Sequence, residues 1–96
     1  MDETLIRKHV DAHADAVVRN DMTALLADFD PSLLPHVGTL AGALPQPVRS
    51  SEVLSLDASG TPAVALIKYV GDDKEITIRS EWSGDERPLI TKAEPA

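Results

Sequence analysis

The chain offers three histidines for chemistry, because the pKa of an imidazole lies near neutral pH. His9 and His13 stand four residues apart in the segment HVDAH, a spacing that can place two zinc ligands on one helical face. Val10 occupies the position at which a helical metalloprotease carries its general-base glutamate, and valine cannot accept a proton. The chain has no cysteine, which excludes thiolate ligands, disulfides and a cysteine nucleophile. We therefore expect no metal site and no cofactor.

Three side chains are candidates for acid–base chemistry: His13, His36 and Tyr69. His13 lies on the apolar side of its predicted helix, where a histidine either packs at the core edge with one hydrogen bond or acts as an acid or base. His36 is the alternative base. The Tyr69 hydroxyl either serves packing or donates to a ligand oxygen. Phe29 and Trp82 add aromatic surface, and Trp82 is also expected as an anchor of the core. The predicted ligand-binding set is therefore His13, Phe29, His36, Tyr69 and Trp82.

Two amphipathic helices are predicted to carry the N-terminal candidates, over residues 4–19 and 22–29. Apolar residues recur at helical spacing along the first helix, and Asn20-Asp21 interrupts the pattern with side chains that favour turns and caps. Asp21 is suited to cap the second helix, which Pro31 brings to an end. The apolar face of the first helix consists of Ile6, Val10, His13, Ala14 and Val17.

Prolines and glycines punctuate residues 32–47, at Pro35, Gly38, Gly42, Pro45 and Pro47. Proline lacks the backbone donor that a helix interior or a central strand requires. This segment is therefore predicted as a short strand or bend followed by an irregular crossing segment.

The second half of the chain has a period of two, which predicts strands over residues 48–57, 62–70, 74–82 and 87–93. The turns between them contain Gly and Asp, which favour tight connections. Strands joined by such short turns are antiparallel neighbours, so a four-stranded meander is expected. The sequence thus predicts a single domain over residues 1–96 with an α+β fold, in which two N-terminal helices lie across the concave face of a curved antiparallel sheet.

Residues 62–70, PAVALIKYV, are apolar on both faces of the predicted strand. A strand of this kind is covered on both sides. The helices supply one cover. A second subunit packed sheet to sheet can supply the other, which predicts a homodimer through the outer sheet face. In the alternative interpretation, the twisted sheet shields the strand by itself.

The formal net charge of −7 disfavours nucleic acid and anionic membranes as partners, because both are bound mainly through Lys and Arg. The acidic start MDET is unlike a secretory signal, and no apolar stretch approaches the roughly 18–20 residues that span a bilayer. These features predict a soluble cytoplasmic protein.

Three stretches resemble the nuclear-transport-factor-two-like superfamily, which has a cystatin-like α+β fold and includes ketosteroid isomerases, SnoaL-like polyketide cyclases and many binding domains. They are residues 13–21, residues 24–29 and residues 82–90, and they cover less than half of the chain. The resemblance implies a cone-shaped α+β barrel with a pocket between helices and sheet, often in a dimer. This chain is shorter than such proteins usually are, which leaves open whether the pocket is shallow, open or filled by Leu40 and Leu44.

The resemblance does not carry over a catalytic acid. The place of the ketosteroid isomerase carboxylate falls on Leu34 or Pro35, and neither can abstract a proton. We therefore expect a small non-enzymatic domain that binds a small apolar ligand or mediates protein association as a homodimer. The alternative is an isomerase, dehydratase or cyclase-type enzyme with His13 or His36 as base and Tyr69 as donor. A regulatory module that acts through protein contact is a third possibility.

Overall fold

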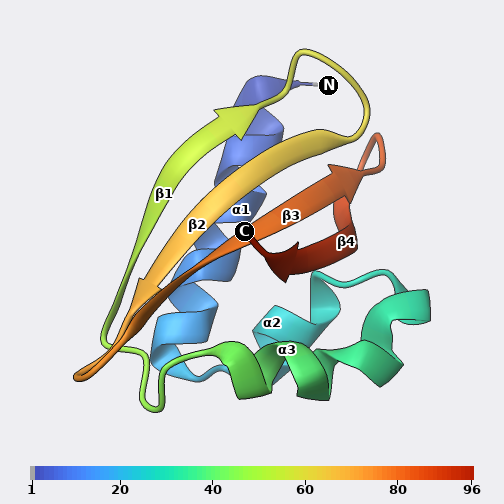
Figure 1. Cartoon of the computed structure of the whole chain (residues 1–96). Helices are drawn as coiled ribbons and strands as arrows, with labels where there is room; N and C mark the ends of the chain where they lie inside the picture. Colours follow the sequence, from blue (N-terminus) through green and yellow to red (C-terminus); the bar gives the residue numbers. More distant parts are fainter. Residues whose placement is uncertain (1) are drawn as a thin grey trace.

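A computed structural model describes residues 2–96 and places helices first and a sheet second (Figure 1). The elements are α1 (Glu3–Arg19), α2 (Met22–Ala27), the 3-10 helix η1 (Pro31–His36), α3 (Val37–Ala43), β1 (Ser50–Asp57), β2 (Ala63–Val70), β3 (Glu75–Ser83) and β4 (Leu89–Pro95). This order confirms the predicted α+β fold. Within residues 2–96, no helix combines the length and apolar character needed to cross a bilayer.

Side chains cap the starts of the first two helices, at Asp21 as the sequence predicts. Asp2 accepts hydrogen bonds from the backbone N–H groups of Thr4 and Leu5 at 2.9 and 3.2 Å, which satisfies donors that an α-helix leaves free at its start. Asn20 ends α1 in the left-handed conformation, with φ 56°. Asp21 then caps α2 by accepting from the backbone N–H of Ala24 at 3.1 Å.

The second helix ends two residues earlier than predicted, at Ala27 rather than Phe29. The backbone N–H of Ile90 donates to the Asp28 carbonyl at 2.7 Å, and the Asp30 N–H donates to the Ile90 carbonyl at 2.9 Å. Phe29 and Ile90 thus form a short parallel bridge at the edge of the sheet. These bonds to β4 replace further helical bonds for residues 28–30.

The prediction of a strand or bend and an irregular crossing over residues 32–47 is wrong, because η1 and α3 occupy most of this segment. Asp30 caps η1 by accepting from the backbone N–H of Ser32 at 3.0 Å. Pro31 is the first residue of η1, a position at which the backbone N–H has no partner within the helix, so its missing donor costs nothing. The glycines of α3 each cost about 1 kcal/mol relative to alanine. Packing offsets this cost, since Val37 is buried and Leu40 and Leu44 pack against the core.

The sheet has the strand order β1-β2-β3-β4 with antiparallel pairs throughout, so the predicted meander is confirmed and the sheet stays open. α1 runs across one face of it (Figure 1). Side chains of β2 alternate between buried and half-buried. The inward-facing residues of β2 and β3 are Ala63, Ala65, Ile67, Tyr69, Ile78, Ser80 and Trp82.

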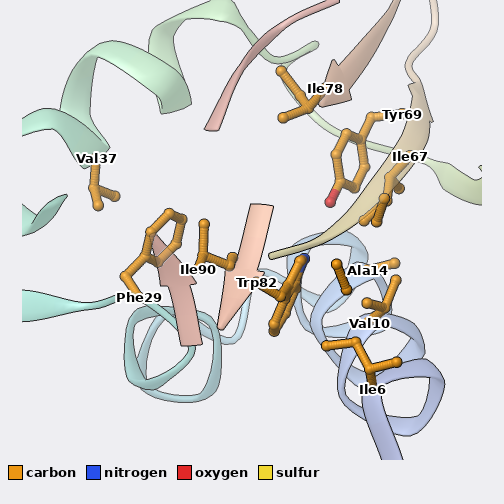
Figure 2. Packing of buried hydrophobic residues seen from close by; sticks show 12 residues of the cluster. Ile6, Val10, Ala14, Phe29, Val37, Ile67, Tyr69, Ile78, Trp82 and Ile90 are labelled. Carbon is orange, nitrogen blue, oxygen red and sulfur yellow. The ribbon is translucent and has the colours of Figure 1, made fainter. Parts of the chain in front are cut away.

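Trp82 is the largest fully buried side chain, which confirms it as a core anchor. Its indole N–H donates to the Ser80 hydroxyl at 2.9 Å, so the one polar group of the ring is satisfied. Figure 2 shows Trp82 between residues of α1, such as Val10, and the strand residue Ile90. The core therefore lies between α1 and the concave sheet face.

Candidate functional site

A cavity of about 230 Å³ lies between the concave sheet face and the helices. Residues of α1, α2 and α3 form one side of its wall, and residues of β2, β3 and β4 form the other. Leu40 and Leu44 line this space and do not fill it. The wall is mainly apolar and contains no Asp, Glu, Lys or Arg among the described residues. Its polar members are His13, Asn20, Gln46, Tyr69 and Ser80.

His13 forms a buried pair with Asp28 at the cavity wall. The imidazole Nδ1 lies 2.8 Å from Asp28 Oδ2, and the two residues are 6% and 7% exposed. α1 supplies the histidine at its apolar face, and the bend after α2 supplies the carboxylate. A buried carboxylate in an apolar surrounding requires such partners, because it loses its hydration on folding.

Arg87 pairs with the other oxygen of this carboxylate, from the loop between β3 and β4. Its Nη2 donates to Asp28 Oδ1 at 2.8 Å and to the Ala27 carbonyl at 3.2 Å. Its Nη1 donates to His9 Nδ1 at 2.8 Å. His13, Asp28 and Arg87 are here called the Asp28 cluster. Both carboxylate oxygens of the cluster are satisfied, and the cluster joins three segments of the chain.

Opposing effects act on the pKa of Asp28. Burial raises this pKa, but hydrogen bonds from His13 and Arg87 and the charges of these groups outweigh burial and lower it below the ordinary value. Asp28 is therefore ionised at neutral pH. Burial and the nearby Arg87 lower the pKa of His9, which fits the acceptor role of its Nδ1 toward the guanidinium.

The ionised carboxylate determines which nitrogen of His13 carries the proton. A carboxylate only accepts hydrogen bonds, so Nδ1 of His13 is the donor. In the neutral imidazole Nε2 is then an acceptor with a free lone pair. No hydrogen bond joins this Nε2 to another residue within 2–96. The ring is held edge-on against Phe29 and Trp82, each with a centroid separation of 5.6 Å.

Tyr69 brings a hydroxyl to the same cavity from β2. The residue is 3% exposed, and in Figure 2 its oxygen points away from β2 into the interior, on the side of Ile90 and Trp82. Burial raises the pKa of Tyr69, and the negative charge of Asp28 adds to the effect. The hydroxyl therefore remains protonated at neutral pH and can donate a hydrogen bond.

The structure brings together three of the five residues predicted for ligand binding, since His13, Phe29 and Tyr69 line the cavity. Trp82 lies behind the wall, against the imidazole of His13. His36 is exposed at the end of η1 and lies outside the cavity. His9 and His13 have separate partners, Arg87 and Asp28.

The sequence analysis missed the two charged residues of the Asp28 cluster. The sequence held one signal for Asp28. This acidic residue stands directly before Phe29, and Phe29 belongs to the apolar side of the second predicted helix. Arg87 had no such signal, since an arginine next to a turn is usually solvated. Its pairing with Asp28 spans 59 residues.

Comparisons of the chain with protein-family models, with curated proteins and with solved structures found no match. The resemblance to the nuclear-transport-factor-two-like superfamily therefore stays a prediction.

We predict that Asp28→Asn lowers the free energy of unfolding at pH 7 by about 1.5–3 kcal/mol, the usual worth of hydrogen bonds to a charged group. The folded-state pKa of Asp28 lies below its ordinary value of 3.8. The stabilisation by the ionised carboxylate is therefore fully present above about pH 4 and is lost as the pH falls through the folded-state pKa. Urea unfolding of both proteins from pH 7 to pH 2 measures this difference.

The matched control is Asp11→Asn, since Asp11 is exposed on α1. It should change the free energy of unfolding at pH 7 by no more than about 0.5 kcal/mol. Equal stability of wild type and Asp28→Asn at pH 7 would contradict the structural role given to the cluster.

Proposed function

We propose that this chain binds a small apolar molecule in the cavity between helices and sheet, as a shortened member of the nuclear-transport-factor-two-like superfamily. The observation that carries the proposal is the cavity itself, about 230 Å³ with a mainly apolar wall, beneath α3. Protein interiors are close-packed and leave few voids of this size, so its presence in a chain of 96 residues points to an occupant.

The volume limits the size of that occupant. An engineered cavity of about 150 Å³ accommodates benzene, so a cavity of about 230 Å³ suits a molecule of roughly ten non-hydrogen atoms. Pockets for drug-sized ligands begin at about 300 Å³. The proposed ligand is therefore smaller than most cofactors.

A second candidate function is acid–base catalysis on such a molecule, with His13 as base. The specific observation in its favour is the hydrogen bond from Nδ1 to Asp28, which orients the ring and leaves Nε2 free at the cavity wall. A base of this kind removes a proton next to a carbonyl group whose oxygen Tyr69 polarises. His36 takes no part in this proposal, because it lies outside the cavity.

We also propose that the outer sheet face binds a second copy of this chain. Val64, Leu66 and Val70 point to this face from β2 and are only half-buried in one chain, and Leu54 is 46% exposed at the bulge of β1. The β3 and β4 side of the face carries ion pairs of Arg79 and Lys92 with Glu81 and Glu94. Lys68 lies on the same face and pairs with Glu75. In the proposed two-fold dimer the apolar side chains meet their copies, with the charged groups around them.

We predict that isopropylbenzene binds to the wild-type protein and that Ala93→Leu weakens this binding at least tenfold. Ala93 lines the cavity from β4, and a leucine there occupies the space of the ligand. Heteronuclear NMR titration of the backbone amides measures the Kd and shows which amides respond. The matched control is Ala12→Leu on the exposed side of α1, which should bind as wild type does. Absence of binding to wild type would exclude the proposed function.

For the enzyme candidate, we predict that the protein exchanges the α-protons of 4-isopropylcyclohexanone for deuterium in heavy water. The expected acceleration over buffer with equimolar imidazole is roughly 10²–10⁴-fold, the usual range for a positioned base. NMR of the ketone measures the rate. His13→Gln should abolish the exchange, whereas His36→Gln should retain it. If the ketone binds but its α-protons exchange no faster than in the imidazole solution, acid–base catalysis by this protein is excluded.

For the dimer, we predict that light scattering gives the mass of two chains and that Leu54→Lys gives the mass of one. A lysine at this position carries its charge into the proposed interface. The matched control is Leu34→Lys, because Leu34 is also 46% exposed but lies in η1, away from the outer sheet face. A single-chain mass for wild type at high concentration would refute the homodimer.

A further inference from the structure

The Tyr69 side chain is buried, but its hydroxyl oxygen keeps access to the cavity and has no hydrogen-bond partner in the described part of the chain. Tyr69 is 3% exposed, and no hydrogen bond joins its oxygen to another residue within 2–96. Buried tyrosine hydroxyls usually have a partner, since an unpaired polar group in an apolar surrounding is costly. The oxygen is not sealed in by protein atoms and belongs to the cavity wall. The missing partner must therefore come from the contents of the cavity.

His13 presents a second unpaired polar atom to the same cavity, with the opposite hydrogen-bonding role. In the neutral imidazole, the Nδ1 proton is committed to Asp28 and Nε2 is an acceptor. Tyr69 lines the same cavity from β2, opposite the helix that carries His13. The cavity thus combines one donor and one acceptor on an apolar wall.

Ser80 adds a further donor from β3. Its oxygen accepts from the Trp82 indole N–H at 2.9 Å, so the hydroxyl proton remains available to the cavity. Ser80 and Tyr69 are on adjacent strands and both face inward. The buried polar residues of the wall are therefore His13, Tyr69 and Ser80, whereas its other two polar residues, Asn20 and Gln46, are exposed.

The charge of the wall limits what this polar part can bind. No Asp, Glu, Lys or Arg lines the cavity among the described residues, and the charges on Asp28 and Arg87, beside His13, are paired with each other. A carboxylate or ammonium group would lose its hydration here without gaining an ion partner. An uncharged ligand avoids this cost.

We propose that the ligand of this cavity is an uncharged alcohol or phenol, whose hydroxyl accepts a hydrogen bond from Tyr69 and donates one to Nε2 of His13. This inference rests on the proposed binding of a small apolar molecule and specifies its polar group. A hydroxyl fits because it is donor and acceptor at once, whereas a ketone leaves Nε2 unpaired and a hydrocarbon leaves both atoms unpaired. Asp28 then acts through His13, because it holds the proton on Nδ1.

The test compares three probes with one skeleton: isopropylbenzene, 4-isopropylphenol and 4-isopropylbenzoate. Their Kd values at pH 7, where the phenol is neutral and the benzoate is charged, are measured by calorimetry and amide NMR. We expect the phenol to bind roughly three- to tenfold tighter than isopropylbenzene, the usual net worth of one or two hydrogen bonds. We expect the benzoate to bind more weakly than isopropylbenzene.

Tyr69→Phe should raise the Kd of the phenol toward that of isopropylbenzene and leave the Kd of isopropylbenzene unchanged, which also shows that the variant is folded. The matched control is Thr77→Val, which removes a hydroxyl from the β3 position next to the inward-facing Ile78, outside the cavity. It should keep the preference for the phenol.

Equal binding of phenol and isopropylbenzene, or tightest binding of the benzoate, would overturn the proposed polar recognition while the binding of an apolar molecule stands. A phenol preference as large in Tyr69→Phe as in wild type would likewise overturn it. Absence of binding by all three probes would remove the proposed function itself.

Discussion

The carboxylate of Asp28 is the constraint on which the arrangement of this protein depends. It is ionised and almost inaccessible to water, so it is tolerable only while both of its oxygens have partners. His13 of α1 supplies one partner and Arg87 of the β3–β4 loop supplies the other. The three segments that carry these groups must therefore lie where they do. Moving α1 or the loop away would leave a buried charge unpaired.

The same constraint shapes the cavity. Because residues 28–30 leave the helix and bond to Ile90, Phe29 is turned toward the interior and the chain enters η1 and α3 on the open side of the sheet. α3 then covers the cavity with the side chains of Val37, Leu40 and Ala41. Residues 28–30 thus carry the buried carboxylate and also lead the chain to the cover of the cavity.

Local signals predicted most elements and failed in one segment for a definite reason. Asn20 and Asp21 favour a left-handed turn and a helix cap through local effects, so the end of α1 and the start of α2 could be predicted from sequence. The turn residues and the period of two likewise predicted the meander. In residues 32–47 the prolines and glycines argue against regular structure, but the burial of Val37 and the packing of Leu40 outweighed them. Such packing is not visible in a local pattern.

By itself the sequence determined the α+β order, the inward side of α1 with His13 on it, and the alternation of side chains along the strands. These features follow from the period of 3.6 residues in a helix and of two residues in a strand, because the period decides on which face of its element a side chain lies. Only the tertiary structure decided which side chains meet across that interior. His13 and Asp28 are 15 residues apart and Asp28 and Arg87 are 59 apart, so their contacts depend on how the helices cross the sheet. The open cavity has the same origin, because the space between two packed layers depends on their separation and not on the pattern of either one.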